Sequence, residues 1–588
     1  MKEPRVWITA AAFLLFLLVT RVTELGVKPY HHDESLYAVE AWRYAKTGAY
    51  QFNPMLHGPF EFHFHAALLK FLPANDFTGR LPVMIFGILF PLLGMLLLRR
   101  RGGAAMVAWL ALCALSPVMC FFSRFLGMDI VMVGLAAAFL YFLLEFLRTQ
   151  RIGYAYGGTV ILAFMISTKL NWLFYAFSFV TFAAVWWFFQ KENRNERLRE
   201  ETRKALGFVK ANWVDFAYCA GLFLVIYAGL YSSLGANREF WKESTILKMV
   251  RYWIAQHEMQ RIKGPFHYYV PLLLIYELPL LIGIAWATLR AAYSKPRRKK
   301  LAFRLLMSTL LIWGACAVNW SWLGPPLGAV FHLEEPWHPA LLTLELSAWW
   351  ILVTYHFERE ETFEAFLVHW GITSLLLYSY AGEKIPWLTT HILLPWFLYL
   401  AVVFSSVISE LIERPVRRAL IGSALILTVG WQGFNVIRSS FAYRADPRER
   451  LVYTHSSWDM VRLVDQIEHL SAATGEGKDL KIEVVGDSAW PLYWYLRDYH
   501  RWFYLEVDPK TAPWVVVTDW TKKDPVAQML GDAYVQERYK LREWWLYETQ
   551  KASMTDIIGY YFTRKPFSVL GSQDIAVFVR RDALPLWQ

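Results

Sequence analysis

The sequence predicts a polytopic α-helical membrane protein that ends in a small soluble α/β domain. Of its 588 residues, 56% are hydrophobic and 17% aromatic, and the 29 tryptophans exceed what an ordinary soluble protein of this size carries. Long apolar runs recur between residues 6 and 437, and after Arg438 the composition becomes mixed and polar. The hydrophobic, tryptophan-rich composition predicts a membrane protein. The extent of the apolar runs and the change after Arg438 predict where the membrane part ends.

The apolar runs define the predicted transmembrane domain, residues 1–437. A helix needs about 17 to 25 residues to cross a hydrocarbon core of about 30 Å, and about thirteen runs meet that requirement. Their approximate limits are 6–22, 81–98, 104–122, 130–147, 152–168, 170–189, 211–232, 267–289, 301–322, 338–355, 364–380, 388–408 and 417–437. The first run lacks a small-residue cleavage site before Arg21, so we interpret it as a retained signal-anchor helix. The loop 23–80 is long enough for one or two helices in the membrane interface.

Basic residues in the short loops predict the orientation, because such residues concentrate on the cytoplasmic side. They fall on one side if the first helix runs outward: Arg99 to Arg101, Arg148 with Arg151, 191–204, 295–300, and Arg414 with Arg417 and Arg418. We therefore expect a multi-pass protein of the inner (plasma) membrane with a cytoplasmic N-terminus. The net charge of +11 then reflects topology and contact with membrane lipids, and it does not indicate nucleic-acid binding.

Residues 438–588 are predicted to form an extracytoplasmic α/β domain. Strands are expected at 481–486, 514–518 and 575–579, and an amphipathic helix at 458–470. The tryptophans and tyrosines of this segment suit either a lipid interface or stacking against sugar rings. They include Trp490, Tyr493, Trp494, Tyr495, Trp544 and Trp545.

Some classes of chemistry find no support in the sequence. The four cysteines all lie in apolar runs, without Cys-x-x-Cys spacing. There is no Walker loop and no Rossmann glycine fingerprint, so neither nucleotide hydrolysis nor a dinucleotide cofactor is indicated.

Polar residues gather at the predicted external ends of the apolar runs. They are Asp33 with Glu34, His57, Arg124, Asp129, Lys169, Glu383 with Lys384, and His391. An ionisable group at the end of a spanning helix is costly to desolvate and therefore predicts a functional site. Structural alternatives stay open: Arg124 and Asp129 can form a helix-end ion pair, and Glu383 and Lys384 can lock a turn.

Transfer of a sugar from a polyprenyl-phosphate carrier fits this set of residues. The lipid needs an apolar slot between helices, and the departing phosphate needs positive charge. The acceptor hydroxyl needs one base in line with the anomeric carbon. We predict that Asp33 takes the proton, that Arg124, Lys169, Lys384 or a metal stabilises the phosphate, and that this single displacement inverts the anomeric centre.

These polar residues and their positions next to the apolar runs resemble those of the GT-C superfamily. That superfamily includes the dolichyl-phosphate-mannose protein mannosyltransferases and the aminoarabinose transferases that act on lipid A. Longer motifs are similar to the prokaryotic flippase-activity-associated family, which is linked to archaeal N-glycosylation. They are His31 to Ala38, Met55 to Pro59, Asp76 to Pro82, Gly382 to Leu388 and Trp490 to Arg497. The resemblance spans nearly the whole chain.

The resemblance implies a GT-C-like fold and specific roles. Asp33 matches the catalytic base or catalytic-loop carboxylate, Glu34 its partner, Asp129 the second carboxylate and Lys169 the basic residue near the carrier phosphate. Where aminoarabinose transferases have Lys-Pro-Pro, this chain has His57-Gly58-Pro59, so a fixed cation becomes a titratable imidazole. No cofactor is certain, and a divalent metal with Asp33, Asp129 or His57 as ligands stays an open alternative.

We therefore predict a membrane glycosyltransferase that moves a sugar from a polyprenyl-phosphate donor to an envelope glycan, lipid or protein at the external face. Substrate or phosphate contacts are expected from Arg124, Lys169 and His57, and from Glu383, Lys384 and His391. The alternative is a non-enzymatic flippase or accessory protein for lipid-linked sugars. An enzyme needs the carboxylates at one face, whereas a translocator needs polar groups that reach across the membrane.

Overall fold

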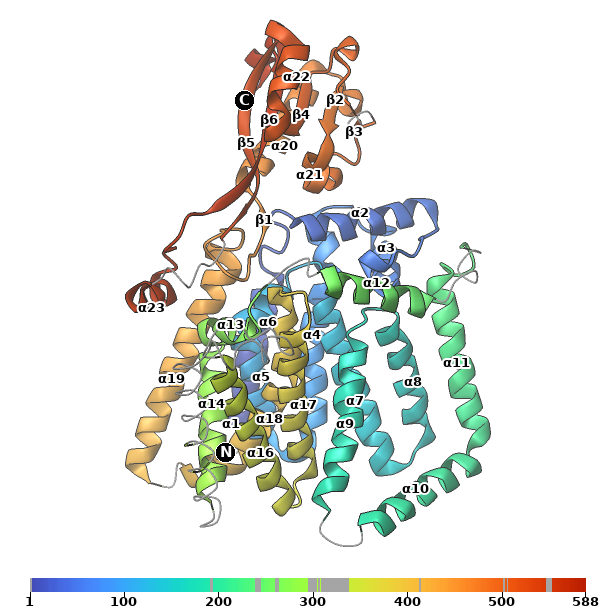
Figure 1. Ribbon diagram of the computed structural model, residues 1–588, viewed down its shortest axis with the longest axis vertical. Helices are drawn as coiled ribbons and strands as arrows, with labels where there is room; N and C mark the ends of the chain where they lie inside the picture. The colour runs from blue at the N-terminus through green and yellow to red at the C-terminus, as the bar shows by residue number, and fades with distance from the viewer. Residues whose placement is uncertain are drawn as a thin grey trace, which may run out of the picture.

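The computed structural model describes residues 3–190, 194–237, 245–259, 264–294, 304, 307, 338–411, 414–500, 503–504, 506–545 and 553–587. A helical bundle carries a mixed α/β domain at one end, and a layer of short helices lies between them (Figure 1).

The bundle is built from helices whose apolar side chains face both each other and the surroundings. Their bounds are α1 Glu3–Val22, α4 Asp76–Leu98, α5 Gly103–Leu115, α6 Pro117–Phe122, α7 Met128–Thr149, α8 Ile152–Ile166, α9 Trp172–Phe189, α11 Trp213–Tyr231, α13 Tyr269–Tyr276, α14 Leu278–Tyr293, α16 His338–Glu358, α17 Thr362–Tyr380, α18 Thr389–Leu411 and α19 Pro415–Ile437. The charged helix α10, Arg194–Ala211, lies at the end of the bundle remote from the C-terminal domain (Figure 1). Exposed apolar side chains such as Val225 on α11 and Ile426 on α19 suit contact with lipid tails. The bundle is therefore that of a polytopic membrane protein.

Fewer than the expected thirteen spans are found in the part of the chain that the structure describes. Within the described residues, eight helices are long and apolar enough to cross a membrane, or nine if the bent pair α13 and α14 forms one span. That pair bends by 102° next to Glu277, and the expected run 104–122 breaks at Ser116 into α5 and α6. Residues 152–168 give only the short helix α8, and residues 301–322 lie outside the described part except for Arg304 and Met307. Hydropathy alone does not register these breaks, because the apolar composition continues through them.

Short helices form a layer between the bundle and the C-terminal domain. They are α2 His32–Thr47, the 3₁₀ turn η1 Pro54–Leu56, α3 Phe60–Leu69 and α12 Thr245–Met259 (Figure 1). The helices α2 and α3 lie in the expected first loop, 23–80. This layer supplies several of the polar residues that the sequence singled out.

The C-terminal domain has one six-stranded sheet with strand order β1-β5-β6-β4-β2-β3. The strands are β1 His455–Ser456, β2 Ile482–Val485, β3 Phe503–Tyr504, β4 Val515–Asp519, β5 Tyr534–Trp544 and β6 Gly571–Arg580. β2 pairs in parallel with β3 and β4, and the other pairs are antiparallel. The three predicted strands correspond to β2, β4 and β6, which confirms the mixed sheet.

Alternation along β4 explains how helices cover both faces of this sheet. Val515 and Val517 join the core under α20 (Trp458–Thr474) and α21 (Ala489–Tyr495), whereas Val516 joins the core under α22 (Lys523–Leu530). Successive side chains of a strand point to opposite faces, so both faces require cover. A last helix, α23 (Met554–Thr563), lies apart from the sheet and beside α19 (Figure 1).

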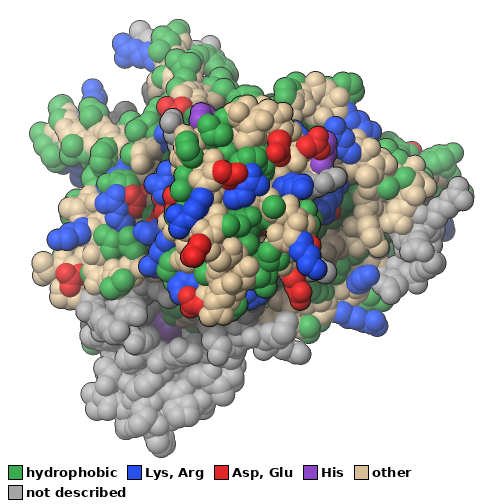
Figure 2. All heavy atoms as spheres, turned by 90° about the horizontal axis from the view of Figure 1, so that it is seen from above, with side chains coloured by type: hydrophobic (Ala, Val, Ile, Leu, Met, Phe, Trp, Pro, Cys, Tyr) green, Lys and Arg blue, Asp and Glu red, His purple; other side chains and the backbone are tan. Residues whose placement is uncertain are grey.

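The surface of the molecule at the end that carries the C-terminal domain is mixed in character. Seen from above, acidic and basic side chains are interspersed at the centre of this surface, and hydrophobic side chains gather toward its edges (Figure 2).

Aromatic residues of α21 fasten the C-terminal domain to the first loop. The Trp494 indole N–H donates to Asp76 Oδ1 over 2.7 Å, and the Tyr495 hydroxyl donates to Asp76 Oδ2 over 2.8 Å. The Tyr495 hydroxyl also accepts the Tyr30 backbone N–H at 2.8 Å, and the Ser456 hydroxyl donates to the Tyr30 carbonyl. Trp494 is only 1% exposed, so here the expected lipid or sugar contact is replaced by docking between domains. The sheet domain thereby holds the residue that immediately precedes His31.

Tyr495→Phe tests this attachment. The change leaves the buried Tyr30 N–H and one Asp76 oxygen without their partner, which costs about 1–3 kcal/mol per group. Hydrogen–deuterium exchange of the peptide around residues 28–34 should become faster. Tyr218→Phe, which changes an exposed side chain of α11, should leave that exchange unaltered; equal exchange in both variants would contradict the docking role.

Candidate functional site

Glu34 and Arg80 form a fully buried ion pair at the base of the site. Arg80 Nε lies 2.8 Å from Glu34 Oε1, and Arg80 Nη2 lies 2.9 Å from Oε2. Arg80 also donates to the carbonyls of Leu25, Lys28 and Pro29. Both side chains are 0% exposed, so the pair replaces the water that these charges lose on burial.

Glu34 also binds two segments of backbone. It accepts the His31 N–H at 2.9 Å and the Leu126 N–H at 2.8 Å. Burial alone would raise the pKa of Glu34, but the positive charges of Arg80 and Lys28 outweigh it and lower the pKa to about 2. Glu34 therefore stays ionised and ties the start of α2 to α4 and to the turn before α7.

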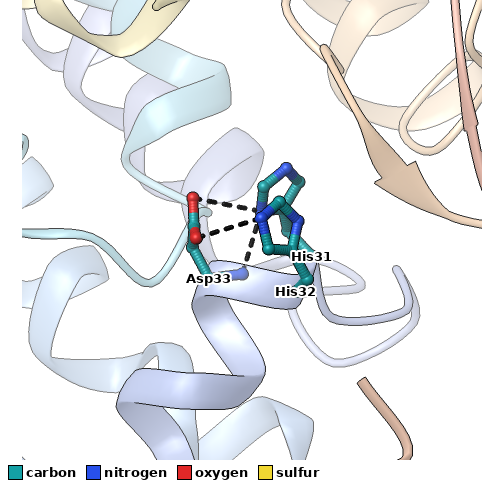
Figure 3. Close-up of side chains that lie close together, drawn as sticks. All are labelled: His31, His32 and Asp33. Carbon is teal, nitrogen blue, oxygen red and sulfur yellow. Dashed lines mark hydrogen bonds and ion pairs between the residues drawn. The ribbon is translucent and has the colours of Figure 1, made fainter. Parts of the chain in front are cut away.

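Asp33 stands beside this pair at the start of α2, with its side chain 30% exposed. The His31 imidazole Nδ1 accepts the Asp33 N–H at 3.1 Å, while Glu34 accepts the His31 N–H, so the two side chains form a capping box. The Asp33 carboxylate lies 3.6 Å from His31 Nδ1 and 3.2 Å from His32 Nε2 (Figure 3). Helix capping thus fixes the backbone of Asp33 and leaves its carboxylate accessible.

His31, His32 and Asp33 are also a candidate metal-binding set. Within the described residues these three converge with their ligand atoms inside 4.8 Å, and of the three predicted ligands only Asp33 belongs to the set. Burial and the nearby His32 and His455 hold the pKa of His31 well below its usual range, so its imidazole is neutral, as a ligand must be. However, Nδ1 already accepts the Asp33 N–H, and ligation through Nδ1 requires that bond to be given up.

Asp129, at the start of α7, lies in a second, separate polar cluster. Lys169 Nζ lies 2.8 and 3.1 Å from its two oxygens. His391 Nε2 lies 2.8 Å from Asp129 Oδ1, and Tyr175 places its hydroxyl 2.6 Å from His391 Nδ1. Residues 129, 169 and 391, which the sequence proposed independently, therefore meet, and Asp129 pairs with Lys169 rather than with Arg124.

The His57-Gly58-Pro59 segment docks onto the chain just before Lys169. The Gly58 N–H donates to the Thr168 carbonyl at 2.8 Å, and the Phe60 N–H donates to the Ser167 carbonyl at 2.9 Å. A Cβ at residue 58 would come within 2.1 Å of the Ser167 oxygen, so only glycine allows this approach. His57 is buried and stacks on Trp253 of α12 with ring centroids 4.7 Å apart. Burial and Lys169 hold the pKa of His57 well below its usual range, so the imidazole is neutral.

Tyr37 lies one turn after Asp33 on α2, and its ring lies 6.0 Å from that of Phe62 on α3. Burial raises its pKa well above the usual range, and the negative charges of Asp33, Glu61, Asp129 and Glu383 add to this effect. Contact of Glu383 with a substrate stays a prediction.

Arg124 and Lys384 are both bonded to backbone carbonyls. Arg124 donates to the carbonyls of Thr20, Arg21, Thr23 and Glu24 at the end of α1. Lys384 donates to the carbonyls of Tyr378, Ser379 and Ala381 at the end of α17, and burial lowers its pKa to about 7. Both cations thus close helix ends in this structure, and their contact with a phosphate stays a prediction.

Several residues of the site were not singled out from the sequence. They are Lys28, Tyr37, Glu61, Arg80, His455 and Arg542. Glu61 carried a usable signal, since it is a lone carboxyl in the aromatic run that follows Pro59. Burial lowers the pKa of Arg542 on β5, and the charge of Asp33 opposes that effect. The two residues are far apart in the chain, so no local pattern marks Arg542.

Arg80→Met tests the Glu34–Arg80 pair. Removing one partner leaves a buried carboxylate unpaired, which costs about 3–5 kcal/mol. The unfolding temperature in detergent should fall markedly, and the double variant Glu34→Gln with Arg80→Met should recover part of the loss. Lys204→Met, which removes an exposed pair with Glu201, should cost at most about 1 kcal/mol. If Arg80→Met and Lys204→Met lower the unfolding temperature by similar amounts, the Glu34–Arg80 pair does not have this structural role.

Comparison with known proteins relates one segment of the chain to a family of glycosyltransferases. Residues 56–201, which include His57, Asp129 and Lys169, match the family model of dolichyl-phosphate-mannose-protein mannosyltransferase. No individual curated protein matched the chain.

Solved structures of one protein share the fold over almost the whole chain. ArnT from Cupriavidus metallidurans in the apo state is 13% identical, with 99% of each chain covered and a TM-score of 0.51. The same protein bound to undecaprenyl phosphate is 14% identical, with 92% of this chain and 96% of that chain covered and a TM-score of 0.50. The chain is thus a polytopic membrane protein with the fold of ArnT, and its residues 56–201 match the dolichyl-phosphate-mannose-protein mannosyltransferase family.

Proposed function

We propose that the protein is a membrane glycosyltransferase of the GT-C type that uses a polyprenyl-phosphate-linked sugar. The family match of residues 56–201 and the fold shared with ArnT, which binds undecaprenyl phosphate, support this donor class. The acceptor is an envelope glycan, lipid or protein. Membership in the flippase-activity-associated family stays part of the proposal.

The placement of Asp33 carries the proposal. Its side chain is 30% exposed, whereas Glu34, Glu61 and Asp129 are each at most 5% exposed. Glu34 is neutralised by Arg80, and Asp129 by Lys169. Of these four carboxylates, Asp33 is therefore the one that an acceptor can reach, and its backbone is fixed by the capping box.

The reaction follows from this arrangement. As the acceptor hydroxyl attacks the anomeric carbon, its proton passes to Asp33 and its oxygen forms the new glycosidic bond. The bond from the anomeric carbon to the carrier phosphate breaks on the opposite face, and the polyprenyl phosphate leaves as an anion. This single displacement inverts the anomeric centre.

Contacts to the phosphate are assigned to Lys169, Lys384 and Arg124, and contacts to the substrate to His57, Glu383 and His391. Since Lys169 and Lys384 already have partners, phosphate binding there exchanges existing bonds for new ones. A divalent ion held by His31, His32 and Asp33 is the second way to supply positive charge.

Orientation completes the proposal. The basic turn Arg99–Arg101 follows the end of α4 that is remote from Asp76, and Asp76 binds the C-terminal domain. We infer from the positive-inside rule that the Asp33 side and the C-terminal domain face outward in the inner (plasma) membrane.

Asp33→Asn tests the assignment of the base. We expect radiolabelled sugar transfer in envelope membranes to fall by about 10²–10⁴-fold, because a positioned base contributes that much. Binding of the donor should persist. Glu40→Gln, on the same helix and paired with Arg43, is the matched control and should retain activity.

Retained transfer in Asp33→Asn would remove this residue as the base. Absence of transfer with every donor tried, together with altered sidedness of lipid-linked sugars in cells without the protein, would favour the flippase alternative. A parallel arm with a chelator reports whether a divalent metal takes part.

A further inference from the structure

Glu61, in the first turn of α3, is a buried carboxyl without a bond to the protein. Its side chain belongs to a residue that is 3% exposed, and within the described residues neither Oε1 nor Oε2 has a hydrogen-bond partner. Buried polar groups are nearly always bonded, because burial without a partner costs free energy. The two oxygens therefore need a hydrogen-bond partner that is not part of the chain.

The position of Glu61 points toward the proposed reaction centre. Phe60, directly before it, donates its N–H to the Ser167 carbonyl at 2.9 Å, two residues before Lys169 of the Asp129 cluster. Phe62, directly after it, places its ring 6.0 Å from that of Tyr37 on α2, the helix that carries Asp33. The charges of Asp129 and Lys169 also act on the Glu61 carboxyl. Glu61 thus lies on a segment that contacts both α2 and the chain just before Lys169.

We propose that Glu61 binds hydroxyl groups of the donor sugar, an inference that rests on the proposed glycosyltransferase function. A neutral carboxyl offers one O–H donor and one carbonyl acceptor, and two neighbouring sugar hydroxyls can satisfy both. Tyr37 provides an aromatic ring near this segment, 6.0 Å from the ring of Phe62, the next residue. The sugar then lies next to the accessible Asp33.

Hydrogen-bonding chemistry favours the sugar over the carrier phosphate as the partner of Glu61. The phosphate of the donor accepts hydrogen bonds only, so the second oxygen of the carboxyl would face it without a bond. A neutral ligand with both donors and acceptors matches this surrounding.

Binding measurements on the purified full-length protein test the proposal. The probes are undecaprenyl phosphate alone and undecaprenyl phosphate carrying a hexose or an aminopentose. We expect Glu61→Leu to weaken binding of the preferred sugar-linked lipid by about 10- to 100-fold, the equivalent of one or two lost hydrogen bonds. Binding of the sugar-free lipid should stay unchanged.

The control variants separate the possible results. Glu61→Gln keeps one donor and one acceptor and should bind the sugar-linked lipid nearly as well as wild type, and so should Glu40→Gln. If Glu61→Leu binds both lipids as wild type does, Glu61 meets only solvent and the inference is wrong. If Glu61→Leu loses the sugar-free lipid as well, Glu61 serves the carrier, and the inference is also wrong. If wild type binds none of the probes, the proposed donor class fails, and the inference fails with it.

The pH dependence of binding gives an independent test. Burial, and after it the charge of Asp129, raises the pKa of Glu61 to about 8, while Lys169 acts in the opposite direction. The carboxyl is therefore neutral below that pH and loses its O–H donor above it. The charged groups that act on the Glu61 carboxyl are Asp129 and Lys169, and the titratable groups on its own helix are His63 and His65.

We expect wild type to lose affinity for the sugar-linked lipid above about pH 8, and Glu61→Gln to show a flatter profile, because an amide does not ionise there. Lys28 and Lys384 also titrate near neutral pH, but both are present in each protein and cancel in the comparison. Identical profiles for wild type and Glu61→Gln would overturn the proposal.

Discussion

The buried Glu34–Arg80 ion pair is the interaction on which the site depends. Glu34 occupies the third position of α2, and its two oxygens bond Arg80 of α4, the His31 N–H and the Leu126 N–H. These bonds hold the first loop, α4 and the turn before α7 in one arrangement. Because Asp33 immediately precedes Glu34 and its carboxylate is accessible, the pair positions the proposed base without touching it. The adjacent carboxylates thus divide into one that fixes the structure and one that is available for chemistry.

The C-terminal domain closes the same loop from the other side. Tyr30 is held through its N–H and its carbonyl by Tyr495 and Ser456, and His31 follows directly in the chain. The ring centroids of His455 and His31 lie 5.5 Å apart. The charge of Asp33 acts on the pKa of Arg542 on β5. The domain is therefore continuous with the proposed site, and a movement of the sheet would be transmitted to residues 30–33. This gives the domain a physical role in forming the site.

Local patterns in the sequence predicted the polar residues well and their partners poorly. Asp33, Asp129, Lys169 and His391 stand out because charge next to an apolar run is costly, and the structure brings the last three together. Arg80 did not stand out as the partner of Glu34, although it lies in a motif that was recognised. The two residues lie on different helices, α2 and α4, and only the fold brings them together. Glu61 was missed, although it is a lone carboxyl in an aromatic run, because the sequence does not report that its side chain is buried. Fewer spans than expected are found among the described residues, because Ser116 and Glu277 interrupt helices inside runs that are otherwise apolar.

The most direct test of the account is the structure of the wild-type protein bound to a non-transferable analogue of a polyprenyl-phosphate sugar. The account predicts that the anomeric carbon faces the Asp33 carboxylate with room for one hydroxyl between them. The phosphate should lie on the opposite face of the sugar, and the Glu34–Arg80 pair should be intact. A sugar held out of reach of Asp33, or with its phosphate on the same side as Asp33, would contradict the role of this residue as the base.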